Sequence, residues 1–121
     1  MAKKILVAED EKPMARALEL KLNNSGFETT VVHDGDQAIK ALLKEKYDLL
    51  LLDLIMPVKD GFVVLEEIKK EKISVPVIVS TNLSQDEDAK KAKDLGAVDY
   101  FVKSDTSISK VVEYIKRVVG V

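Results

Sequence analysis

Short apolar runs alternate with longer amphipathic stretches along the whole chain. Each apolar run has three or four residues, is rich in leucine or β-branched side chains, and does not alternate with polar residues. This pattern is typical of strands that are buried on both faces of a parallel sheet. The predicted strands span residues 5–8, 29–32, 49–52, 77–79 and 100–102.

The stretches between these runs place apolar residues three and four positions apart, which predicts amphipathic helices. Gly26 and Gly96 follow two of the stretches, at positions where helices commonly end. Asp34 is a candidate N-cap, and Ser84 and Glu87 have the spacing of a capping box. The predicted helices span residues 12–25, 35–46, 61–71, 85–95 and 106–119.

Strand–helix units in series predict an α/β domain with a doubly wound, five-stranded parallel sheet. Successive runs begin about 20 to 28 residues apart, which leaves room for a right-handed crossover helix each time. Two strand orders are common for such sheets, and the spacing does not choose between them. In the order 2-1-3-4-5 the chain direction reverses between the first and third strands, and ligands bind outside the carboxyl ends of the strands there.

Carboxylates, a hydroxyl and an ammonium follow different predicted strands. Glu9 and Asp10 come after the first, Asp53 after the third, Thr81 after the fourth and Lys103 after the fifth. Carboxylates before a helix favour its N-terminus, so the first two have a purely structural explanation when taken alone. Three carboxylates at one edge of a sheet repel each other unless a cation binds there. Oxygen ligands without cysteine suit Mg²⁺.

Together these groups form a plausible site for placing a phosphoryl group on Asp53. Phosphoryl transfer needs chiefly positioning and charge neutralisation, and carboxylates are known nucleophiles of this kind. The metal ion and Lys103 would neutralise the phosphoryl oxygens, and Thr81 would donate a hydrogen bond to them.

The composition narrows the class of protein. A chain of 121 residues with 46% hydrophobic residues predicts a single globular domain over residues 1–121. There is no cysteine, which excludes disulfides, thiolate zinc sites and cysteine nucleophiles. A net charge of −2 and 5% aromatic residues argue against direct nucleic-acid binding. The apolar runs are too short for a membrane span or a signal peptide, so we expect a soluble, cytoplasmic protein without membrane contacts.

Four segments together resemble the receiver domain of two-component response regulators, the CheY-like family. They are residues 5–11, 53–57 with 60–61, 77–81 and 96–103. The segments have the family's order and spacing, and the resemblance covers the whole chain. It implies a flavodoxin-like (βα)5 sandwich with the strand order 2-1-3-4-5.

The resemblance implies a role for each matching residue. Asp53 would be the phosphoacceptor, and Thr81 and Lys103 would hold the phosphoryl oxygens. Tyr100 occupies the aromatic switch position, where the ring turns inward as the threonine moves toward the phosphoryl group.

The same resemblance implies a Mg²⁺ site and two kinds of partner. Asp10 and Asp53 would bind the ion, with Glu9 nearby or acting through water and the carbonyl of Ile55 as a backbone ligand. The phosphoryl donor would be a histidine kinase or a histidine phosphotransfer protein. A downstream protein would read the face formed by residues 85–95, 100–102 and 106–119. The domain would be a signalling switch that catalyses only its own phosphorylation and dephosphorylation.

Three positions depart from the family's pattern. Ser104 stands where a proline joined by a cis bond is usual, and a cis bond costs about 3–4 kcal/mol before other residues, so we predict a trans bond or a strained cis one. Asn82 replaces a smaller residue, and we expect it to slow the access of phosphodonors or water. Ile55 cannot orient water by hydrogen bonding, which predicts slow to moderate autodephosphorylation.

Other functions fit the sequence less well. An FMN binder of the flavodoxin type needs an anion-binding loop after the first strand, where residues 9–11 would repel phosphate. The dinucleotide-binding and P-loop motifs do not occur. A phosphatase of the haloacid dehalogenase type has a second carboxylate two residues after its aspartate nucleophile, where this chain has Ile55. We interpret the lone His33 as a structural residue rather than as a phosphoryl relay. The alternative that remains is a receiver-like interaction module whose output does not depend on phosphorylation.

Overall fold

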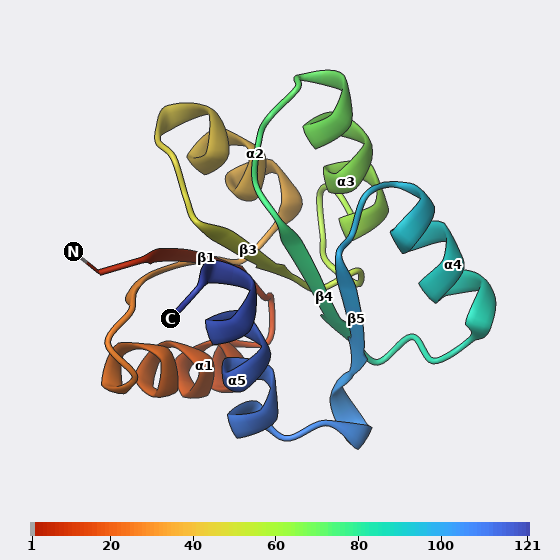
Figure 1. Ribbon diagram of the computed structural model, residues 1–121. Helices are drawn as coiled ribbons and strands as arrows, with labels where there is room; N and C mark the ends of the chain where they lie inside the picture. Colours follow the sequence, from red (N-terminus) through yellow and green to blue (C-terminus); the bar gives the residue numbers. More distant parts are fainter. Residues whose placement is uncertain (1) are drawn as a thin grey trace.

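The computed structural model describes residues 2–121. Its five strands form one parallel sheet in the order β2-β1-β3-β4-β5, which confirms the predicted flavodoxin-like α/β fold (Figure 1). The strands are β1 (Lys4–Ala8), β2 (Glu28–Val32), β3 (Leu49–Leu52), β4 (Val77–Thr81) and β5 (Asp99–Val102). The helices are α1 (Lys12–Asn24), α2 (Gly35–Lys44), α3 (Gly61–Lys70), α4 (Asp86–Asp94), the 3-10 turn η1 (Lys103–Asp105) and α5 (Ile108–Val119). Within residues 2–121, none of these helices has the length and apolar character needed to cross a bilayer.

Helices cover both faces of the sheet (Figure 1). α1 and α5 pack on one face, and α2, α3 and α4 pack on the other. Successive residues of a strand point to opposite faces. Leu50 and Leu52 therefore pack toward α2 and α3, while Leu49 and Leu51 pack toward α1 and α5. All four leucines of β3 are buried, which explains why this strand is uninterrupted leucine.

The two outer strands, β2 and β5, are less buried than predicted. Every residue of β3 and β4 is buried, whereas every residue of β2 and β5 is at least partly accessible. The reason is their position, because β2 and β5 are the edges of the sheet and have a neighbouring strand on one side only. The prediction of burial on both faces was therefore wrong for these two strands.

Most helix ends agree with the sequence, with two corrections. Asp34 caps α2 by accepting a hydrogen bond from a backbone N–H of its first turn, as predicted. Ser84 does not cap α4, because it stays in the loop after β4 and Gln85 becomes the N-cap residue without a side-chain hydrogen bond. The predicted capping box was therefore wrong. The last helix begins at Ile108 with Ser107 as its N-cap, two residues later than predicted, because η1 precedes it.

Two glycines allow close backbone contacts around the loop that follows β3. A Cβ atom on Gly61 would lie 2.5 Å from the carbonyl oxygen of Asp53 and 2.7 Å from the Cα of Leu54. A Cβ atom on Gly35 would overlap the backbone of Lys59 in the same loop. The N–H of Gly61 also donates to the carbonyl of Leu54 at 3.0 Å. The start of α3 thus touches the backbone that carries Asp53.

Candidate functional site

Four strand ends bring the predicted site residues to one edge of the sheet. Glu9 and Asp10 follow β1, Asp53 follows β3, Thr81 ends β4 and Lys103 follows β5. β1 and β3 are hydrogen-bonded neighbours although α1, β2 and α2 separate them in the chain. This is the point where the strand order reverses and where ligands of such sheets bind.

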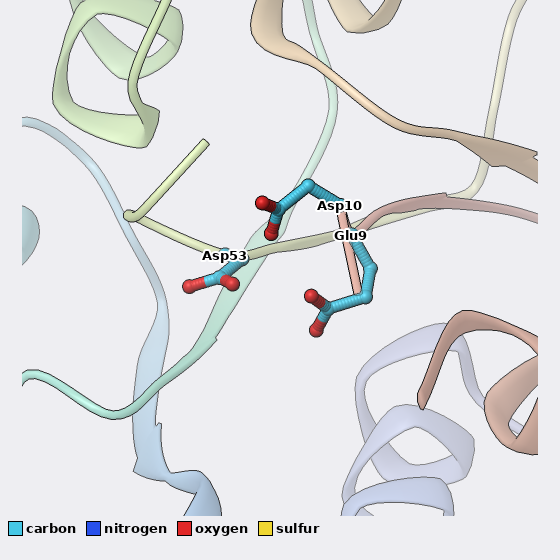
Figure 2. Close-up of side chains that lie close together, drawn as sticks. All are labelled: Glu9, Asp10 and Asp53. Atoms are coloured by element: carbon cyan, nitrogen blue, oxygen red, sulfur yellow. The ribbon is translucent and has the colours of Figure 1, made fainter. Parts of the chain in front are cut away.

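Glu9, Asp10 and Asp53 form an acidic cluster at this edge. One carboxylate oxygen of each lies within 4.8 Å of the other two, and the side chains surround a common space (Figure 2). Glu9 and Asp53 are buried, and Asp10 is the most accessible of the three. Carboxylate oxygens are the ligands of hard divalent cations such as Mg²⁺. The donor set therefore fits a divalent metal ion.

The ammonium group of Lys103 lies among carboxylates. Its Nζ is 2.5 Å from Oε1 of Glu9, 2.9 Å from Oδ2 of Asp53 and 3.3 Å from Oε1 of Glu11. The side chains of Lys103, Glu9 and Asp53 are 6%, 3% and 4% exposed, whereas that of Glu11 is 61% exposed. Buried carboxylates are tolerated only when they are paired. Lys103 is the cation that allows Glu9 and Asp53 to be buried side by side.

Burial and ion pairing have opposite effects on the pKa values in this group. Burial alone would lower the pKa of Lys103, but hydrogen bonds to Glu9 and Asp53 outweigh it, and the pKa lies above its ordinary value. Burial raises the pKa of Glu9, and the Lys103 ammonium and the backbone N–H of Glu11 oppose that effect. Lys103 therefore remains charged at neutral pH and gives the site a fixed positive charge.

Asp53 is held by its own loop and borders a cavity. Its Oδ1 accepts a hydrogen bond from the backbone N–H of Ile55 at 3.2 Å, while its Oδ2 accepts one from Lys103 at 2.9 Å. The cavity has a volume of about 150 Å³ and is lined by Asp10, Glu11, Asp53, Ile55, Asn82 and Lys103. This volume exceeds the roughly 30 Å³ share of one water molecule several times, so a small anion fits beside Asp53. The carbonyl of Ile55 as a metal ligand stays a prediction.

Thr81 and Tyr100 both hydrogen-bond to the backbone of Leu83. Oγ1 of Thr81 accepts from the N–H of Leu83 at 3.4 Å, and the hydroxyl of Tyr100 donates to its carbonyl at 2.7 Å. Thr81 is fully buried and does not line the cavity. Tyr100 packs against the core under α2, α3 and α4, and burial, aided by the charges of Asp88 and Asp53, raises its pKa to about 12. One loop residue therefore connects the two.

Comparison with known proteins decides the family. The sequence model of the response regulator receiver domain matches residues 5–116. The chain belongs to the response regulator receiver domain family. Receiver domains are signalling modules rather than classical enzymes.

Solved structures of receiver domains have the same fold over nearly the whole chain. The Francisella response regulator 1452 receiver domain is 30% identical, with a TM-score of 0.92, and the alignment covers 98% of this chain and 97% of that one. The signal receiver domain of a signal transduction histidine kinase from Syntrophus aciditrophicus is 29% identical, with a TM-score of 0.88 and coverage of 98% and 91%. A DNA-binding response regulator of the LuxR family from Staphylococcus aureus is 27% identical, with a TM-score of 0.89 and coverage of 97% and 98%.

This receiver domain has site contacts that the sequence did not predict. Glu11 approaches Lys103, and the signal for it was the third consecutive carboxylate after the first strand. Leu83 contributes through its backbone, for which a side-chain pattern carries no signal. Residues 2–121 contain no cis peptide bond, so the bond between Lys103 and Ser104 is trans, which is the first of the two alternatives predicted.

Proposed function

We propose that this receiver domain, over residues 1–121, accepts a phosphoryl group on Asp53 from a histidine kinase or a histidine phosphotransfer protein. The observation that carries the proposal is the environment of the Asp53 carboxylate. It is buried at the end of β3, its Oδ2 lies 2.9 Å from Nζ of Lys103, and it borders an open cavity of about 150 Å³. A carboxylate held against a cation beside a cavity is positioned to act as a nucleophile.

In the proposed reaction a carboxylate oxygen of Asp53 bonds to phosphorus as the bond from phosphorus to the imidazole nitrogen of the donor breaks. The electron pair stays on the imidazole, which takes up a proton. Lys103 neutralises charge on the phosphoryl oxygens, and the N–H of Ile55 orients the carboxylate. Glu9, Asp10, Asp53 and the carbonyl of Ile55 would hold Mg²⁺. When bound, the ion supplies positive charge next to the phosphoryl oxygens.

The switch that follows phosphorylation would start at Thr81. The Thr81 hydroxyl accepts a hydrogen bond from the N–H of Leu83. Rotation of the hydroxyl toward a phosphoryl group would break this hydrogen bond. The carbonyl of Leu83 is bonded to Tyr100 on β5, so a change in the loop reaches the face formed by α4, β5 and α5. A downstream partner would bind this face in one of two conformational states.

Asn82 and Ile55 line the cavity and would set the phosphoryl lifetime. Asn82 narrows the access of phosphodonor and water, so Asn82→Ala should increase the rates of both phosphorylation and dephosphorylation. Unchanged rates would contradict this role. The apolar side chain of Ile55 offers no hydrogen bond to a hydrolytic water, which predicts slow to moderate autodephosphorylation.

Chemical mapping tests the proposed acceptor. Borohydride reduces an aspartyl phosphate to homoserine with release of phosphate, so peptide mapping after phosphorylation should find homoserine at position 53. Homoserine at another aspartate would overturn the assignment. Asp53→Asn tests the alternative of a phosphorylation-independent interaction module, because such a module would bind its partner equally well with and without this substitution.

A further inference from the structure

The hydrogen-bonding capacity of Lys103 is fully used in this structure. A lysine ammonium has three N–H donors and no acceptor. Its Nζ faces one carboxylate each from Glu9, Asp53 and Glu11, at 2.5, 2.9 and 3.3 Å. A phosphoryl oxygen can therefore bind Lys103 only if one of these three contacts is released.

Glu11 is the contact that is released most easily. It has the longest of the three distances, and its side chain is 61% exposed, whereas Glu9 and Asp53 are 3% and 4% exposed. A released Glu11 carboxylate is hydrated at once, whereas Glu9 or Asp53 would remain buried with a backbone N–H as partner but without a cation.

The side chain of Glu11 also has no role in capping a helix. It is the N-cap residue of α1, but it makes no capping hydrogen bond. Its backbone N–H donates to Oε2 of Glu9 at 3.1 Å, a contact that does not depend on the side chain. The Glu11 carboxylate is therefore not needed to cap α1, and it lines the cavity together with Asp10, Asp53 and Lys103.

We propose that Glu11 is a displaceable anion that occupies Lys103 until a phosphodonor arrives and that selects among donors by their charge. This inference rests on the proposed function of Asp53. A carboxylate at the rim of the cavity repels a dianion about twice as strongly as a monoanion. Glu11 therefore disfavours small dianionic acyl phosphates most, and it favours donors that gain binding energy from contacts elsewhere on the domain.

The test compares two small phosphodonors on wild type and Glu11→Gln at saturating Mg²⁺. Acetyl phosphate is a dianion at neutral pH and phosphoramidate carries a smaller net charge. In both reactions the Asp53 oxygen bonds to phosphorus, and acetate or ammonia leaves with the electron pair. At low salt, Glu11→Gln should accelerate phosphorylation about tenfold with acetyl phosphate and about threefold with phosphoramidate. Both accelerations should shrink as the salt concentration rises.

The controls separate charge at the rim from a change in folding. Glu19→Gln removes a carboxylate about two turns further along the same helix and should leave both rates unchanged. Glu11→Ala should accelerate phosphorylation as Glu11→Gln does, and neither should change the thermal unfolding midpoint by more than a few degrees. Equal rates in wild type and Glu11→Gln, or the same acceleration with both donors at every salt concentration, would overturn the inference.

The outcome also distinguishes this inference from the proposed function. If wild type and Glu11→Gln are phosphorylated on Asp53 at equal rates, only the role of Glu11 fails. If Asp53→Asn is still phosphorylated in the Glu11→Gln background, the proposed acceptor itself is wrong. Beryllofluoride, a phosphoryl mimic, gives a readout without phosphoryl transfer, and Glu11→Gln should bind this monoanion about threefold more tightly.

Discussion

The hydroxyl of Tyr100 donates a 2.7 Å hydrogen bond to the backbone carbonyl of Leu83 and so joins β5 to the loop that follows β4. The N–H of the same leucine is bound to Thr81 at the end of β4. A change in the loop after β4 therefore reaches the side chain of Tyr100 on β5.

Tyr100→Phe should destabilise the domain by about 1 kcal/mol, because it removes one hydrogen bond and leaves the carbonyl of Leu83 without its donor. Urea unfolding at neutral pH measures the change. Tyr114→Phe is the matched control, since the Tyr114 ring packs edge-on against Phe101 at a centroid distance of 4.8 Å, away from this loop. A loss no greater for Tyr100→Phe than for the control would contradict the prediction.

The contribution of Tyr100 to stability should depend on pH in the alkaline range. Burial raises its pKa from 10.0 to about 12 in the folded state, so the neutral phenol is favoured by folding. The contribution is therefore fully present below pH 10 and is lost as the pH rises toward about 12. The difference in unfolding free energy between wild type and Tyr100→Phe should shrink as the pH rises from about 10 to about 12. A difference that stays constant or grows would contradict the burial of the phenol.

Gly61→Ala and Gly35→Ala should each destabilise the domain by about 2–3 kcal/mol, because the added Cβ overlaps backbone atoms that cannot move away freely. Gly26→Ala is the control. Gly26 has a φ of +92° but no atom within 4 Å of a Cβ, so only backbone strain of about 1–2 kcal/mol is expected there. Denaturant unfolding of the three variants should give the smallest loss for Gly26→Ala. The reverse order would show that the loop after β3 is looser than the structure indicates.

Lys103→Met should cost about 3–5 kcal/mol, because it leaves Glu9 and Asp53 buried side by side without a cation. Adding Asp53→Asn removes one of the two negative charges and should recover part of the loss. The measurement is a double-mutant cycle of unfolding free energies at neutral pH without divalent ions. Additive losses would show that Lys103 does not pair with Asp53 in solution.

The fold was predictable because short, uninterrupted apolar runs indicate strands that are buried on both faces. Four consecutive leucines at residues 49–52 can be satisfied only between two layers of helices, and β3 lies there. The accessibility of β2 and β5 did not follow from the apolar pattern, because that pattern does not show which strands form the edges of the sheet. The strand order implied by the family resemblance does place these two strands at the edges. The helix at residues 85–95 was predicted to within one residue at each end, but its capping was missed, because Ser84 stays in the loop and Gln85 becomes the N-cap without a side-chain hydrogen bond.

The site was predictable where it depends on topology alone. Residues that follow parallel strands share one edge of the sheet, so Glu9, Asp10, Asp53 and Lys103 come together once the strand order is known. Side-chain direction was not predictable. The burial of the Thr81 hydroxyl depends on the loop backbone, which the pattern of residue types does not specify.

The most direct test of phosphorylation on Asp53 is the intact mass of the protein after incubation with acetyl phosphate and Mg²⁺. We expect one phosphoryl increment, which disappears when EDTA replaces Mg²⁺ and when Asp53 is changed to asparagine. If acetyl phosphate is too slow a donor because of Glu11, the increment should appear with Glu11→Gln or with a purified histidine kinase. An increment that persists in Asp53→Asn, or a folded protein that none of these donors phosphorylates, would contradict the proposed function.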